Sequence, residues 1–400
     1  MDYDYSPTAL KKVVYAGTQA TRFQQGSRDL KELAELDVSP ERVRRATERI
    51  GKERVAERDA QAAAYEALPI PAQRAVPADQ PTPAVACVQM DGGRLQLFDR
   101  AEPQRNEDET FWREMKVGCL WSMTSDVSVE DPCPRLPASF VDPERMQRIV
   151  LEIKGFSGPD GSAEDEAEEP RIDERPGRPQ PLARSVVATR HDVETCGKLL
   201  ASEAYQRRFP AAARKAFVAD GADANWGVWR RHFSDYVPIL DFIHALTYVY
   251  AAALAGRGLQ EGWQAYRQWA QELWSGHVDR VIAALELRQQ ALGEPSKETP
   301  KTAPSAIVAR SLGYLRNQRC RMNYPEYRKQ GLPITSTYVE STVKQINRRM
   351  KGTEKFWSRG VESMLTLVAD HLGDTPTLAH FWRNRPHRLT GSRCCESHAA

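Results

Sequence analysis

The chain has 400 residues, of which 41% are apolar and 28% charged, and this is enough for two to four folded units with an ordinary globular core. Its seven cysteines form no CxxC pair, so we expect neither a disulfide framework nor a zinc site of that spacing, and the thiols favour a reducing cytoplasm. The first residues lack the apolar core of a signal peptide, and the most apolar stretch, 238–256, is too short and too polar to predict a membrane span.

The amino-terminal residues 1–68 are charged and have a helical pattern. Residues 29–51 predict two helices around a short turn, with Ser39 as the cap and Pro40 as the first residue of the second helix. This order suits a helix-turn-helix that enters a DNA groove, but the pattern alone slightly favours a plain helical hairpin. Residues 69–83 are rich in proline and predict a linker.

The pattern changes to strands from residue 84, and we interpret residues 84–234 as the first part of an α/β core. Apolar runs at 84–93, 113–123 and 215–221 predict strands, and residues 191–206 predict a helix. The acidic segment 157–184 has almost nothing to bury, so we expect a disordered insertion there.

Beyond this core the pattern is helical from 235 to about 292, and we assign residues 235–330 to a helical region. A helix is expected to begin near Thr337, and residues 331–370 are expected to complete the core. The last residues, 371–400, are interpreted as a tail.

The charge is unevenly distributed, although its sum is only +2. Residues 301–331 carry seven basic residues against one acidic residue, and residues 341–393 are also mostly basic. Because local basic surface binds phosphates whatever the total charge, the composition does not exclude a nucleic-acid partner.

Two aspartates follow apolar runs, and each precedes a glycine: Asp91 and Asp220. In α/β folds, ligand sites gather at the carboxyl ends of strands, where side chains leave the packed interior. A glycine beside the acid would let a metal ion or a phosphate approach the backbone. For either aspartate alone, an ordinary Asp-Gly turn after a strand is the better interpretation.

A third acid, Glu340, lies in the first turn of the helix expected near Thr337. One face of this helix carries an apolar stripe that would dock on a core: Val339, Val343, Ile346 and Met350. The neighbouring, more exposed face carries the acid with polar and basic residues behind it: Glu340, Lys344, Asn347 and Lys351. This arrangement suits metal binding beside a DNA phosphate. Thr337 and Glu340 also match a capping box, and spacing alone leaves these two interpretations even.

At these residues the sequence resembles the bacterial insertion-sequence transposases of the Mutator-like superfamily, a branch of the DDE transposases. The resemblance covers most of the chain, roughly residues 84–370. Three segments carry it: VQMDGGR (88–94) with FWREMKVGCLWSM (111–123), KAFVADGADANW (215–226) with YVPILDFIHALTYVY (236–250), and GLPITSTYVESTVKQINRRMKGTEKFW (331–357). The last segment is the most specific, because a glutamate helix followed by a basic, glycine-containing run is long and unusual.

The resemblance implies an RNase H-like mixed sheet with a helical insertion before the catalytic glutamate. The first catalytic aspartate belongs on the first strand and corresponds to Asp91. The second follows the fourth strand and corresponds to Asp220, which the family pattern favours over its neighbour Asp223. The glutamate lies on a late helix and corresponds to Glu340.

The family also carries a C/D-x-x-H motif after its second aspartate, and here this motif corresponds to Asp241 and His244. Three residues apart on a helix, the two side chains share one face and are expected to support the site. Without the resemblance, a histidine packed in the core is the preferred interpretation of His244. The segment 124–190 is longer than the family core needs, and the amino-terminal DNA-binding region is short.

The resemblance further implies two Mg²⁺ ions, for which Mn²⁺ can substitute, held by Asp91, Asp220 and Glu340. The implied partner is double-stranded DNA, both the terminal inverted repeats of the element and the target. The protein is expected to act as a homo-oligomer on DNA in the bacterial nucleoid. The residues expected to contact DNA are on the glutamate helix: Lys344, Asn347, Arg348 and Lys351.

Two other classes of protein remain open at this point. One is a catalytically inactive or domesticated transposase derivative that only binds DNA. The other is a helical interaction protein with no role on DNA, which leaves the two Asp-Gly strand ends and the basic glutamate helix unexplained.

Overall fold

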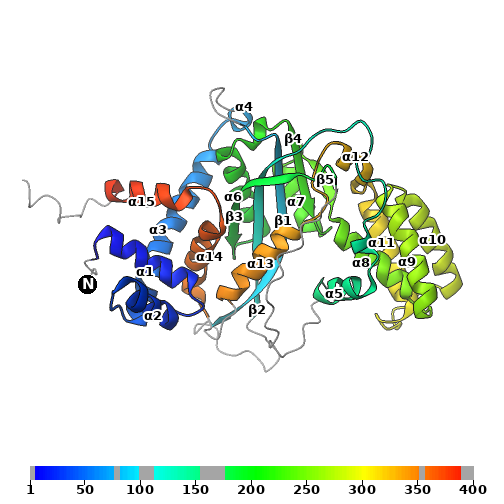
Figure 1. Ribbon diagram of the computed structural model, residues 1–400, viewed down its shortest axis with the longest axis horizontal. Coiled ribbons are helices and arrows are strands. Elements are labelled where there is room, and N and C mark those ends of the chain that lie inside the picture. The colour runs from blue at the N-terminus through cyan, green and yellow to red at the C-terminus, as the bar shows by residue number, and fades with distance from the viewer. Residues whose placement is uncertain (1–4, 76–81, 99–111, 154–175, 351–355, 389–400) are drawn as a thin grey trace, which may run out of the picture.

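A mixed β-sheet lies between two groups of helices in the computed structural model, which describes residues 5–75, 82–98, 112–153, 176–350 and 356–388 (Figure 1). The strands are β1 (Val85–Phe98), β2 (Trp112–Thr124), β3 (Gln180–Thr189), β4 (Arg214–Ala219), β5 (Val237–Leu240) and β6 (Phe356–Trp357). Their order is β3-β2-β1-β4-β5, and β6 pairs with the last part of β1. Strands β1, β4 and β5 are parallel, whereas β2 is antiparallel to β1 and β3. The expected α/β class is therefore confirmed.

The helices form three groups along the chain. The amino-terminal group is α1 (Pro7–Gln19), α2 (Phe23–Ala34), α3 (Pro40–Glu66) and α4 (Ile70–Arg74). The helices within the sheet region and after it are α5 (Pro143–Ile153), α6 (Val193–Gln206), α7 (Asp223–His232), α13 (Thr337–Met350), α14 (Ser358–Leu372) and α15 (Thr377–Arg388). The remaining group is α8 (Phe242–Leu254), α9 (Leu259–Trp274), α10 (Val278–Leu292), α11 (Pro304–Gln318) and α12 (Tyr324–Lys329).

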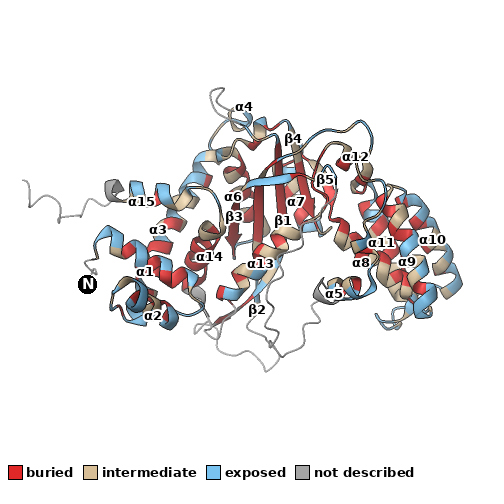
Figure 2. Cartoon of the chain, viewed as in Figure 1, coloured by how far each residue is buried: buried red, intermediate tan, exposed pale blue. Residues whose placement is uncertain are grey.

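Helices α6 and α13 cover opposite faces of the sheet. At Gly118 of β2 the side chain of Leu200 of α6 comes so close that a Cβ atom would lie 2.4 Å from it. The next residue, Cys119, instead contacts Thr342 of α13. Since consecutive strand residues point to opposite faces, the sheet is covered on both sides, and its strands are buried along most of their length (Figure 2).

The amino-terminal helices pack onto the sheet region through α14, which contacts both α3 and β3. Two ion pairs join α3 to α14: Arg54 with Asp370 at 2.8 Å, and Arg58 with Glu362 at 2.8 Å. The two helices predicted in residues 29–51 are present, with Pro40 at the first helical position of α3. Ser39 stands at the cap position, but its side chain makes no capping hydrogen bond there.

The helical group α8 to α12 forms a separate bundle on the β5 side of the sheet (Figure 1). Aromatic rings fill its inner end, where Phe242 of α8 packs edge-on against Trp274 and Tyr324. Residues from the segment after β2 also join this bundle: Tyr266 donates a hydrogen bond to the carbonyl of Phe140 at 2.7 Å. The segment following β2 is thus tied to the bundle.

Two expectations about boundaries are wrong, and two further segments contain a helix. The helical region does not begin at residue 235, because 237–240 form β5 and the helices start at Phe242. The segment expected to be disordered, 157–184, ends in structure, since β3 begins at Gln180; its residues 157–175 lie outside the described part. The linker contains the short helix α4, and the tail contains α15.

Within the described ranges, no helix combines the length and the apolar character needed to cross a membrane.

Candidate active site

Three neighbouring parallel strands, β1, β4 and β5, bring an aspartate to the same level of the sheet. Met90 of β1 pairs with Ala219 of β4, and Ala219 in turn pairs with Leu240 of β5. The residue that follows in each case is an aspartate: Asp91, Asp220 and Asp241. Because neighbouring strands lie about 4.8 Å apart, the sheet itself brings three acidic residues together that are far apart in the sequence.

Asp91 lies within β1 and not at its end, which corrects the expectation that the strand stops at Asp-Gly. Its backbone pairs with Val117 of β2, and the strand runs on to Phe98. Gly93, two residues later and therefore on the same face, approaches Val343 of α13. The Asp91 side chain thus lies on the face that α13 covers. Burial raises the pKa of Asp91 to about 6, and the nearby charge of Asp220 adds to this effect.

Asp220 follows β4 directly, and the start of α7 holds one of its carboxylate oxygens. Oδ1 accepts hydrogen bonds from the backbone N–H of Ala222 at 3.0 Å and from the side-chain amide of Asn225 at 2.9 Å. The neighbouring Asp223 lies in the first turn of α7 and is exposed. The structure therefore brings Asp220, and not Asp223, into the row of aspartates.

Asp241 is fully buried and caps α8. It accepts hydrogen bonds from the backbone N–H of His244 at 2.7 Å and from the backbone N–H of Ser336, just before α13. The His244 ring nitrogen Nδ1 lies 3.2 Å from the same carboxylate. Burial alone would raise the pKa of Asp241, but these hydrogen bonds and the charge of His244 outweigh it, so the pKa is lowered.

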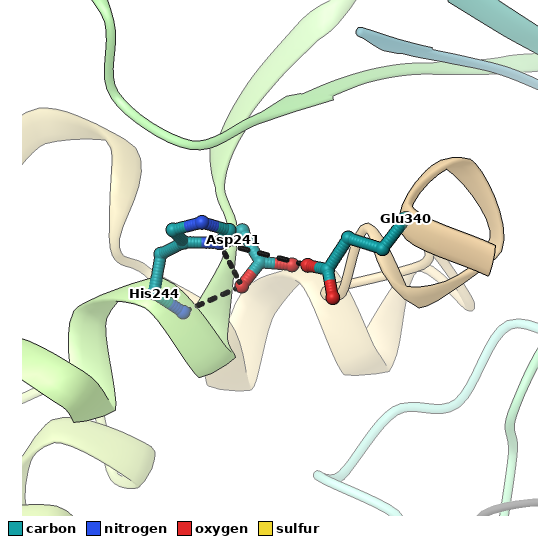
Figure 3. A group of neighbouring side chains, drawn as sticks. All are labelled: Asp241, His244 and Glu340. Atoms are coloured by element: carbon teal, nitrogen blue, oxygen red, sulfur yellow. Dashed lines mark hydrogen bonds and ion pairs between the residues drawn. The ribbon is translucent and has the colours of Figure 1, made fainter. Parts of the chain in front are cut away.

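Glu340 extends from α13 towards Asp241 and lies on the opposite side of the Asp241 carboxylate from His244 (Figure 3). Its Oε1 lies 3.8 Å from Nδ1 of His244 and accepts a hydrogen bond from the Ser336 hydroxyl at 3.2 Å. Burial and the charge of Asp241 raise the pKa of Glu340 to about 7. Burial would lower the pKa of His244, but the hydrogen bond with Asp241 and the charges of Asp241 and Glu340 raise it to about 9.

The helix start shows that Glu340 does not occupy the capping-box position. Helix α13 begins at Thr337, and the carbonyl of Ser336 accepts the first backbone hydrogen bonds, from Val339 and Glu340. Ser336 is therefore the cap residue, and Glu340 lies four residues after it instead of three. Its carboxylate is directed towards His244 and the Ser336 hydroxyl.

Asp241, His244 and Glu340 form a group that could hold a metal ion, since one ligand atom from each lies within 4.8 Å of the others. The sequence predicted a metal set of Asp91, Asp220 and Glu340 and only a supporting role for the pair on α8. The structure places this pair in the centre of the acidic cluster. The donor chemistry suits a divalent cation, because buried carboxylates with raised pKa values repel one another and a cation relieves that repulsion.

The residues expected to contact DNA lie on both the exposed and the inner side of α13. Lys344 and Arg348 are exposed, Asn347 is half-buried, and Lys351 lies outside the described residues. Their neighbour Arg349 points inwards and donates a hydrogen bond to the carbonyl of Gly17 at 2.9 Å. Some basic residues of α13 are therefore exposed at the surface, whereas others bind the amino-terminal helices.

Arginines of α3 form ion pairs with glutamates of the same helix. Arg44 lies 2.6 Å from Glu48, and Arg45 lies 2.7 Å from Glu41. These pairs lie at helical spacing and are partly exposed, so they neutralise part of the positive charge that a DNA-binding helix would present.

The sequence matches none of the known protein-family models and none of the curated proteins.

Proposed function

We propose that this protein is a DNA transposase of the DDE type, with an RNase H-like core that cleaves DNA strands and joins them to a target. The observation that carries this proposal is the row of aspartates in β1 and directly after β4 and β5, faced by Glu340 of α13. The RNase H-like fold requires the first catalytic aspartate on the first strand, the second after the fourth strand and the glutamate on a late helix. Asp91, Asp220 and Glu340 meet these three requirements.

The arrangement suits metal-dependent cleavage of a phosphodiester. Divalent ions would supply Lewis-acid stabilisation for the displacement at phosphorus, and Mg²⁺ prefers the oxygen ligands offered here. Asp91, Asp220 and Glu340 would hold these ions, with Asp241 beside them. His244 holds a proton next to Asp241 and Glu340, and this positive charge compensates the acids until a divalent ion binds.

The DNA would lie along α13. Glu340, Lys344 and Arg348 follow one another at intervals of four residues, so they share one face of this helix. The two exposed cations therefore continue outwards from the acidic site, where they can contact phosphates that flank the cleaved bond. Binding of this kind falls with salt, because each neutralised phosphate releases counterions.

Strand cleavage in vitro tests the proposal. The substrate is a supercoiled plasmid that carries the sequences flanking the reading frame, incubated with Mg²⁺, Mn²⁺ or EDTA. We expect nicking with either metal and none in EDTA. Asp220→Asn should lower the rate by more than about 100-fold, since loss of a ligand exceeds the effect of losing a residue that only orients one. Asp223→Asn, three residues away and exposed, is the matched control and should keep its activity.

A protein that binds the plasmid but nicks it in neither metal would be the inactive, DNA-binding derivative, and the proposed activity would be wrong. Equal activity in Asp220→Asn and the wild type would equally contradict the assignment of the site.

A further inference from the structure

Helix α11 of the bundle contacts the backbone of the residue pair Asp220-Gly221. The hydroxyl of Tyr314 donates a hydrogen bond to the carbonyl of Asp220 at 2.6 Å. The side-chain amide of Gln318 donates to the carbonyl of Gly221 at 3.0 Å. Tyr314 and Gln318 lie four residues apart, so one face of α11 holds two consecutive carbonyls of the loop that carries Asp220.

Gly221 is the residue that lets α11 come this close. Its φ angle is +97°, in the region that side-chain-bearing residues rarely adopt. A Cβ atom at this position would lie 2.9 Å from the ring and the hydroxyl of Tyr314. The expectation that this glycine makes room for a metal ion or a phosphate is therefore wrong, because the Tyr314 ring fills the space.

Both side chains are themselves held in place. The Tyr314 ring stacks in parallel on Tyr248 of α8, with centroids 3.7 Å apart and an interplanar angle of 11°. Gln318 is buried, and its carbonyl oxygen accepts a hydrogen bond from Arg321 at 2.8 Å. The Arg321 guanidinium in turn lies over the ring of Trp226 of α7, 4.3 Å from its centroid. Groups fixed in this way can set the position of the loop to which they bind.

The hydrogen bonds of Asp220 leave one carboxylate oxygen for a ligand. Oδ1 is occupied by Ala222 and Asn225, whereas no hydrogen bond to Oδ2 occurs among the described residues. The orientation of Oδ2 depends on the backbone of Asp220, because a short side chain has little freedom once Oδ1 is fixed. That backbone is the part that Tyr314 holds.

We propose that Tyr314 and Gln318 are positioning residues of the helical bundle, which fix the Asp220-Gly221 backbone so that Asp220 presents Oδ2 to a divalent cation. This inference rests on the proposed function, since it takes Asp220 as a metal ligand. It gives the bundle a part in building the metal site, beyond its place as an insertion in the core.

Mn²⁺ binding to the metal-free full-length protein, measured by calorimetry, tests the inference. Tyr314→Phe removes the hydroxyl donor but keeps the stacked ring. Tyr248→Phe is the matched control, because it alters the other ring of the same stack and its hydroxyl makes no hydrogen bond within the described structure. We expect Tyr314→Phe to weaken Mn²⁺ binding about tenfold, the size of effect seen for partners of metal ligands, and to raise the Mg²⁺ concentration needed for half-maximal nicking. Tyr248→Phe should leave both values near those of the wild type.

A second variant, Gln318→Met, removes the other donor while keeping the length of the side chain, and should weaken Mn²⁺ binding in the same direction. Melting temperatures in EDTA show whether each variant folds. If the wild type binds Mn²⁺ but Tyr314→Phe and Gln318→Met bind it equally well, the inference is overturned and the proposed function stands. Equal weakening in Tyr248→Phe would also overturn it, because the stack and not the hydrogen bond would then matter. A wild type that binds no Mn²⁺ would overturn the proposed function together with the inference.

Discussion

His244 Nδ1 lies 3.8 Å from Oε1 of Glu340, although almost the whole helical bundle separates the two residues in the chain. Asp241 makes this possible, because it caps the first helix of the bundle and also binds the backbone N–H of Ser336 at the start of α13. The chain therefore enters the helical bundle and leaves it again at the same place, which is the acidic cluster.

His244→Ala tests whether the imidazole serves the site or only the fold. The ring contacts Asp241 and Glu340, so its loss leaves buried carboxylates without their nearest positive charge. We expect nicking to fall by about tenfold or more, and the free energy of unfolding to fall by only about 1–3 kcal/mol, the range for a lost charged hydrogen bond. His191→Ala, at an exposed position, is the control for the loss of a histidine. Unchanged nicking with a large loss of stability would make His244 a structural residue.

The stability that Asp91 and Glu340 contribute to the metal-free protein should fall as the pH rises from about 5 to 8. Burial raises the folded-state pKa of Asp91 to about 6 and that of Glu340 to about 7. A raised pKa means that the folded state binds the proton more tightly than the unfolded state. The resulting stability is fully present below the unfolded pKa, near pH 4, and is lost as the pH rises through the folded value.

Urea denaturation in EDTA at pH 5 and pH 8 measures this loss. Asp91→Asn cannot titrate, so the difference between the two pH values should shrink relative to the wild type, by at most about 3 kcal/mol for a shift of about two units. The charge of Asp91 also helps to raise the pKa of Glu340, so its removal lowers the contribution of Glu340 in the same direction. An identical pH dependence in Asp91→Asn would show that Asp91 is not held in a buried acidic cluster.

DNA binding should depend on the exposed cations of α13. Neutralising Lys344 and Arg348 together should weaken binding to DNA of any sequence, and should reduce the slope of log K against log salt by about two. The charge-matched control neutralises two exposed arginines of the helical bundle, Arg267 of α9 and Arg280 of α10. A slope that changes as much in the control, or not at all in the α13 variant, would place the DNA elsewhere.

The strands that the sequence predicts correctly, β1, β2 and β4, are those in which apolar residues predominate. In β4, for example, all four residues from Ala216 to Ala219 are buried, and all four are apolar. The missed strands lack this signal. The first residues of β3, from Gln180, are exposed and follow a polar segment, and β5 is an edge strand of four residues that contains Pro238. Proline is tolerated in such an edge strand, but a proline in the sequence argues against predicting a strand there.

The candidate site is predictable only in part, for a physical reason. Asp91, Asp220 and Glu340 each carry a local signal, an Asp-Gly pair or a place on an amphipathic helix. Their convergence depends on the pairing of β1, β4 and β5, which joins distant segments and has no local cause. The central place of Asp241 follows from the same pairing. Tyr314 and Gln318 belong to an ordinary helix in the sequence, and only the packing of α11 against the loop shows their contacts.

The most direct test of the central claim compares wild type with Glu340→Gln in Mn²⁺ binding, melting temperature and nicking on the same preparations. Glutamine keeps the length of the side chain and a hydrogen-bond acceptor for Ser336, but it removes the charge that a metal ligand needs. We predict that Glu340→Gln melts in EDTA at or above the wild-type temperature, because a buried charge has been removed. It should gain less from added Mg²⁺ than the wild type, bind Mn²⁺ more weakly, and fail to nick DNA while still binding it. Full nicking activity in Glu340→Gln, with Mn²⁺ binding unchanged, would contradict the account.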